Sequence, residues 1–101
     1  MNNIDKTHEA YEVVTVVEVL VDRGHFRLEA VRVLNGPTHK YMVHYYRETE
    51  IWIDDKGTVN ARSVPGATRY SLWVRDVSQP SAYDDRSAED AIDYAIHWLT
   101  Q

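Results

Sequence analysis

Four glycines, each standing alone in a short polar segment, separate the extended parts of this chain from one another. They occupy positions 24, 36, 57 and 66, next to Asp, Asn and Pro residues that are typical of turns. Because every connection between extended segments is short, consecutive strands are expected to pair antiparallel. The sequence therefore predicts an antiparallel meander.

The extended segments are rich in Val, Tyr, Trp and Thr, which is typical of strands. The five predicted strands are Tyr11–Asp22, Phe26–Leu34, Lys40–Asp54, Thr58–Val64 and Arg69–Val77. The alternation of the second strand slips near Ala30–Val31, which predicts a β-bulge there unless both faces are covered. The third segment is interpreted as one long strand bent near Arg47–Glu50, with two shorter strands as the alternative. The fourth has few apolar residues, which suits a sheet edge.

A helix is predicted at about 87–100. Ser87 with Glu89 and Asp90 resembles a capping box at the N-terminus of the helix. One apolar stripe then follows at spacings of three and four: Ala88, Ala91, Ile92, Ala95, Ile96 and Leu99.

The predicted fold class is α+β, a five-stranded antiparallel β-meander with one C-terminal α-helix packed on one face. All 101 residues form a single domain, in which residues 1–10 form a short helix or a loose N-terminal arm. A partly closed barrel capped by the helix is the alternative architecture.

Composition excludes several classes of protein. There is no Cys, so disulfides and thiolate metal sites cannot form. A net charge of −5 with scattered Arg residues speaks against nucleic-acid binding. The N-terminus lacks the apolar core of a secretory signal, and no apolar run reaches the roughly 18–20 residues of a membrane span. These features predict a cytoplasmic protein that binds neither nucleic acid nor membrane.

The sequence contains no catalytic motif, and we expect no metal site and no cofactor. His39 and His44 are five residues apart, so on one strand they would lie on opposite faces. His25 and His39 lie in or beside turns and are expected to be solvated. The acidic residues before the helix and in its first turn could bind a divalent cation, but helix capping explains them better. They are Asp84, Asp85, Glu89 and Asp90.

The aromatic residues carry the functional hypothesis. Three Trp and seven Tyr are many for this length, and such side chains suit interfaces and half-wet clefts. We expect the helix to cover Tyr41, Val43, Tyr45, Ile51 and Ile53. The opposite face would then need a partner or would line a pocket, and its predicted residues are Met42, His44, Tyr46, Trp52 and Trp73. If the register changes at the predicted bend, these assignments exchange beyond it.

The favoured hypothesis is a non-catalytic protein-interaction module that forms a homodimer through this aromatic sheet face, or binds another protein there. We favour the dimer over a curled sheet around a ligand because the turns and few glycines indicate little curling. One alternative is a small-molecule-binding or enzymatic cup lined by Tyr45 or Tyr46, Trp52, Trp73 and His44, in which His44 acts with Glu48 or Glu50. Another is an acidic inhibitor that mimics nucleic acid.

Overall fold

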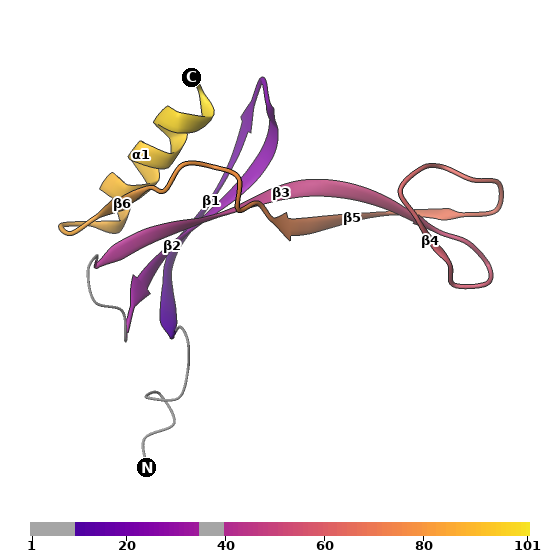
Figure 1. The fold of residues 1–101 in the computed structure, drawn as a ribbon, viewed down its shortest axis with the longest axis horizontal. Coiled ribbons are helices and arrows are strands. Elements are labelled where there is room, and N and C mark those ends of the chain that lie inside the picture. Colours follow the sequence, from indigo (N-terminus) through magenta and orange to yellow (C-terminus); the bar gives the residue numbers. More distant parts are fainter. Residues whose placement is uncertain (1–9, 35–39) are drawn as a thin grey trace, which may run out of the picture.

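The computed structural model of the protein describes residues 10–34 and 40–101. The N-terminal segment predicted at residues 1–10 lies almost entirely outside this part. The turn predicted around Gly36 also lies outside it, as do His8 and His39. The described chain forms one antiparallel sheet and one helix (Figure 1). The elements are β1 (Tyr11–Val21), β2 (Gly24–Val33), β3 (Tyr41–Ile53), β4 (Val59–Asn60), β5 (Thr68–Arg75), β6 (Tyr83–Asp84) and α1 (Ala88–Leu99).

β1 and β2 form a hairpin that contains one bulge. The register shifts between Val13 and Thr15, so Val14 is the extra residue. The shift lies opposite Ala30 and Val31, where the sequence pattern slips, but the additional residue belongs to β1 and not to β2. Ala30 and Val31 are both fully buried on opposite faces of the sheet, which accounts for two consecutive apolar residues.

β3 is one continuous strand of 13 residues that changes partner halfway along. Its first half pairs with β2, from Tyr41 to Arg47. Its second half pairs with β5, from Tyr46 to Ile53, without a register shift. The predicted single long strand is therefore confirmed, and the alternation of its two faces continues through Arg47–Glu50.

The second half of β3 and β5 leave the body of the protein as a two-stranded ribbon (Figure 1). We call residues 48–75 the arm. β4 contributes only two pairs near the tip of the arm, where Trp52 pairs with Asn60 and Ile53 with Val59. β6 pairs with the beginning of β3 at Tyr41 and Met42.

The core lies between α1 and the body of the sheet, where α1 packs against β1, β2, β3 and β6. A helix of 12 residues is about 18 Å long, so it does not extend over the arm. Every residue of the buried core cluster comes from outside the arm: Phe26, Leu28, Ala30, Val43, Tyr45, Ala82, Ala88, Ala91, Ile92, Ala95 and Leu99.

The capping prediction for α1 is confirmed. The Ser87 hydroxyl accepts a hydrogen bond from the Asp90 backbone N–H at 3.1 Å. Asp84 holds the preceding turn, because its carboxylate accepts hydrogen bonds from the Arg86 and Ser87 backbone N–H groups. At the other end of the helix Arg23 donates a hydrogen bond to the Trp98 carbonyl oxygen at 3.5 Å, where positive charge is favoured.

The α+β class, the antiparallel sheet and the single C-terminal helix are thus as the sequence predicts. The sheet has six strands among the described residues, where five are predicted. The additional strand is β6, and β5 pairs with β3 where a simple meander would pair it with the strand before it.

Candidate functional site

One apolar surface outside the core cluster lies on the arm. On the side of the sheet that faces α1 in the body, the register places Thr49 opposite Leu72 and Ile51 opposite Tyr70. We call the apolar side chains on this side the arm strip; they are Ile51, Ile53, Tyr70, Leu72 and Val74. Tyr70, Leu72 and Val74 are 47%, 43% and 46% exposed. Ile51 and Ile53 lie on the expected face of β3, but beyond the core cluster that the helix covers.

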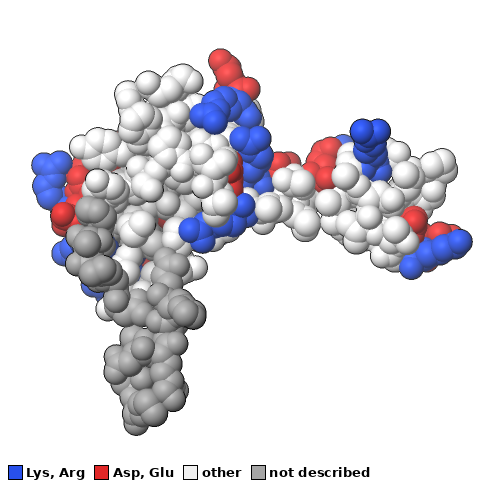
Figure 2. All heavy atoms as spheres, in the orientation of Figure 1, with Lys and Arg blue, Asp and Glu red and all other residues white. Residues whose placement is uncertain are grey.

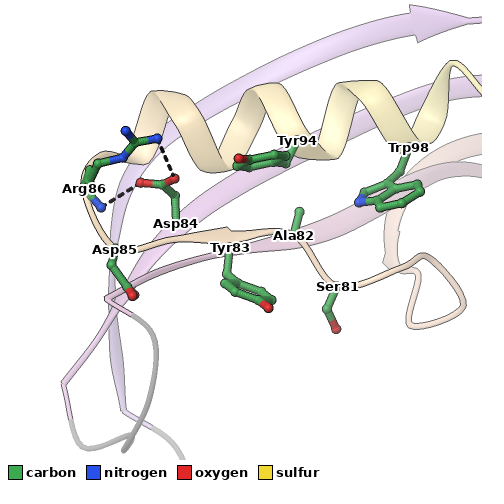
Figure 3. A pocket seen from close by; sticks show the side chains of 8 residues that line it. All are labelled: Ser81, Ala82, Tyr83, Asp84, Asp85, Arg86, Tyr94 and Trp98. Carbon is green, nitrogen blue, oxygen red and sulfur yellow. Dashed lines mark hydrogen bonds and ion pairs between the residues drawn. The ribbon is translucent and has the colours of Figure 1, made fainter.

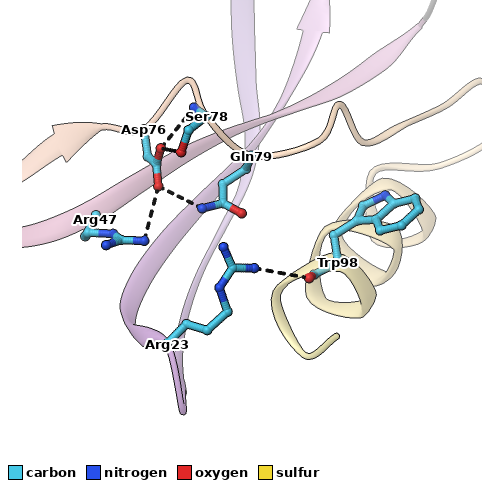
Figure 4. A network of polar contacts seen from close by, with 6 residues as sticks. All are labelled: Arg23, Arg47, Asp76, Ser78, Gln79 and Trp98. Carbon is cyan, nitrogen blue, oxygen red and sulfur yellow. Dashed lines mark hydrogen bonds and ion pairs between the residues drawn. The ribbon is translucent and has the colours of Figure 1, made fainter.

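The base of the arm is fastened to the body on this side by a polar network (Figure 4). Asp76, directly after β5, accepts hydrogen bonds from the Ser78 hydroxyl at 2.5 Å and from Gln79 Nε2 at 2.9 Å. Arg47 forms an ion pair with Asp76 at 3.6 Å, and its guanidinium lies 5.0 Å from the centre of the Phe26 ring. The hydrogen bonds from Ser78 and Gln79 hold the pKa of Asp76 below its ordinary value.

We expect Asp76→Asn to lower the free energy of unfolding by roughly 1.5–3 kcal/mol at pH 7, the usual contribution of hydrogen bonds to a charged group. Because the folded-state pKa of Asp76 is depressed, this stabilisation is present above the unfolded-state pKa near 3.8 and is lost as the pH falls through the folded-state pKa. Urea unfolding of wild type and variant at pH 7 and at steps toward pH 3 measures the difference. A difference that stays constant over this range would contradict the role of the Asp76 carboxylate.

The loop between β5 and β6 is held against the body by Tyr45. Burial raises the pKa of Tyr45 to about 12, so its hydroxyl remains a donor at neutral pH. It donates a hydrogen bond to the Pro80 carbonyl oxygen at 3.0 Å. The loop is therefore tied to the same strand that continues into the arm.

The five predicted interface residues share the opposite face of the sheet, which we call the open face. Met42, His44, Tyr46 and Trp52 alternate along β3, and Trp73 lies opposite Glu48 on the same side. His44 is 2% exposed, with the Tyr11 ring edge-on at 4.7 Å, whereas the other four are half-buried. Burial and the neighbouring Glu29 carboxylate raise the pKa of Tyr46. Other exposed apolar side chains on the open face come from β6, at Tyr83, and from β1: Val13, Val14, Val16 and Leu20.

Only part of the predicted cup lines one hollow. Met42, His44 and Tyr45 line a hollow of about 160 Å³ beside the loop after β5, whereas Tyr46, Trp52 and Trp73 are not among its described lining residues. The proposed His44–Glu48 pair is also replaced, because Glu48 bonds to His25.

His25 fastens the arm to the body on the open face. Its Nδ1 lies 2.6 Å from Glu48 Oε2 and its Nε2 lies 3.6 Å from Glu18 Oε1. The Trp73 ring meets the imidazole edge-on at 4.9 Å. His25 lies beside the turn between β1 and β2 and is 37% exposed, as expected for a solvated side chain, but it also has these partners. Sequence reasoning missed this contact because it joins the start of β2 to β3 and β5, and only the three-dimensional register brings them together.

A second surface lies between β6 and α1, where an open groove of about 530 Å³ is lined by residues of both elements (Figure 3). Tyr94 and Trp98 project from the exposed side of the helix and form one wall. At one end Arg86 forms ion pairs with Asp84 and Asp90. The hydrogen bond from the Arg86 backbone N–H is the main cause of the lowered pKa of Asp84. Asp84 and Asp90 thus stabilise the turn before α1 and the first turn of the helix, as predicted.

Acidic and basic side chains are interspersed on the face of the described chain that Figure 2 shows. Ion pairs join opposite charges on neighbouring strands, such as Glu12 with Arg32 and Glu50 with Arg69. No group of three or more metal-ligating side chains occurs among the described residues. The described part of the chain also contains no helix with the length and apolar character needed to cross a membrane.

Comparisons with protein-family models, with curated proteins and with solved structures found no match to this chain.

Proposed function

We propose that this protein is a non-catalytic protein-interaction module that self-associates through the sheet surface that α1 does not cover, with the arm at the centre of the contact. The observation that carries the proposal is the arm strip. It is a contiguous apolar strip on a ribbon of only two strands, outside the core cluster.

The physical reason is that such a ribbon is poorly stable by itself. An isolated pair of strands is marginal in water, and a third strand or a packed face is needed for independent stability. Tyr70, Leu72 and Val74 also expose apolar area side by side, which is the pattern of a docking surface more than of scattered surface residues. A partner that adds strands to the ribbon, or packs on the strip, would stabilise the ribbon and reduce its exposed apolar area.

The charge pattern and the pocket geometry favour this proposal over its two alternatives. A ligand cup around His44 has the weaker support, because Tyr46, Trp52 and Trp73 lie away from the hollow beside His44. A nucleic-acid mimic would need a run of unpaired acids, whereas Glu12, Glu50 and Asp84 each have an Arg partner.

Sedimentation of the whole chain at about 1 to 100 µM tests the proposal, since this range spans the affinities of transient interfaces. We expect the weight-average mass to rise with concentration from 11.8 kDa toward twice that value. A mass that stays at that of one chain over the whole range would contradict self-association.

A further inference from the structure

We propose that the partner of the arm is the arm of a second copy, and that the two β5 strands pair antiparallel about a two-fold axis at Ser71. This inference rests on the proposed function, because it names the partner of the same arm and the register of the contact, which is made at the outer edge of β5 beside the arm strip. It joins two ribbons into one sheet of four strands in the order β3, β5, β5 of the partner copy, β3 of the partner copy.

The outer edge of β5 is available for such pairing. In the described part of the chain β5 pairs only with β3. The Asp76 backbone N–H donates to the Tyr45 carbonyl oxygen, and backbone groups alternate in direction along a strand. The N–H and C=O groups of residues 69, 71, 73 and 75 therefore point away from β3.

β5 carries little of the protection that proteins give to an exposed edge, since its only charged side chains are Arg69 and Arg75 near its two ends. Its sequence, TRYSLWVR, contains no Pro and no Lys, and its pairing with β3 has no bulge. Its eight residues give about 26 Å of straight edge. A long, regular and apolar edge of this kind is a template for pairing with another strand.

The charges of β5 select among the possible registers. An axis at Leu72 would place Arg69 directly opposite Arg75 of the second copy, and like charges in that position destabilise a sheet. An axis at Ser71 places Arg69 opposite Trp73 and Thr68 opposite Val74. It also places Tyr70 opposite Leu72.

The register at Ser71 places favourable cross-strand neighbours on both faces of the new sheet. On the side of the arm strip, Tyr70 and Leu72 of each copy become direct cross-strand neighbours, with Cβ atoms about 4.5–5.5 Å apart. On the open face, each Arg69 lies beside a Trp73 ring and can form a cation–π contact. Arg69 is also paired with Glu50 of its own chain at 3.6 Å, so its charge remains balanced in the assembly.

Single-cysteine crosslinking tests the register, because the natural chain contains no Cys. At a two-fold axis through Ser71 the two Cα atoms are about 5.5 Å apart, which a disulfide can span. We expect the majority of Ser71→Cys chains to form a covalent dimer under mild oxidation. Leu72→Cys is the matched control, since its two Cα atoms would be about 7–8 Å apart and beyond a disulfide's reach.

The outcomes separate this inference from the proposed function. Both variants are first sedimented in reducing buffer, and crosslinking is compared at concentrations at which each variant is associated to the same extent. If the wild-type chain is monomeric, both the proposed function and the pairing at Ser71 are overturned. If the chain associates but Ser71→Cys does not crosslink, or Leu72→Cys crosslinks better, the register at Ser71 is wrong while self-association stands.

Discussion

Replacing Phe26 with Ala is expected to lower the free energy of unfolding by about 3–5 kcal/mol, the usual cost of removing a large aromatic side chain from a core. Phe26 is fully buried. It lies between Val19 of β1 and Arg47 of β3 in the sheet, and the Arg47 guanidinium packs over its ring. Its removal would therefore leave a cavity and would also loosen the contact that joins the core to the base of the arm. Urea or thermal unfolding measures the loss.

Two further variants identify the cause. Tyr94→Ala removes an aromatic ring that is 49% exposed on the helix, and we expect it to cost less than about 1 kcal/mol. Phe26→Leu keeps most of the apolar volume but removes the cation–π contact, so its cost should lie between those of Phe26→Ala and wild type. Equal losses for Phe26→Ala and Tyr94→Ala would contradict the assignment of Phe26 to the core.

The helix could be predicted from local signals alone. The apolar stripe at spacings of three and four and the Ser87 cap place it within one residue of its observed bounds. The strands β1, β2 and β3 were also found from their Val, Tyr and Trp content. For these elements the local preference and the tertiary structure agree, so the sequence is sufficient.

The pairing of β5 could not be predicted because it is not local. A strand of 13 residues can hold different partners along its length, and nothing in the turns indicates that β5 returns to β3. The segment predicted as the fourth strand pairs over only two residues. The short β6 was missed because two residues, Tyr83 and Asp84, carry no periodicity at all.

The bulge illustrates what an apolar pattern can and cannot determine. The two consecutive buried residues Ala30 and Val31 lie on opposite faces of a regular strand, so their pattern arises because both faces are covered there. It does not indicate the additional residue in the pairing of β1 and β2. The structure places it at Val14, since β2 must stay regular to pair with β3 on its other edge.

The five predicted site residues do share one face, because β3 alternates without interruption through the base of the arm. The difference lies in the extent of the helix. Ile51 and Ile53 are expected under it, whereas α1 packs only on the body of the sheet. Tyr70, Leu72 and Val74 lie beyond the helix on the same side and are exposed.

Replacing Leu72 with Asp is expected to weaken self-association roughly 100- to 1,000-fold. A side chain at the centre of an interface typically contributes about 2 kcal/mol or more, each tenfold change in affinity corresponds to about 1.4 kcal/mol, and a two-fold axis presents the substitution twice. Leu72 is 43% exposed in the single chain, so the charge should cost little folding stability. Sedimentation equilibrium measures the shift, and circular dichroism verifies that the variant is folded.

Leu20→Asp makes the same chemical change away from the arm. Leu20 is 82% exposed near the end of β1, on the open face. Its substitution should change the free energy of association and the free energy of unfolding by less than about 0.5 kcal/mol each. The pair of variants therefore distinguishes the arm strip from the β1 part of the open face, where Val13, Val14 and Val16 are also exposed. If Leu20→Asp prevented association while Leu72→Asp did not, the contact would lie on the β1 side and the arm would not be its centre.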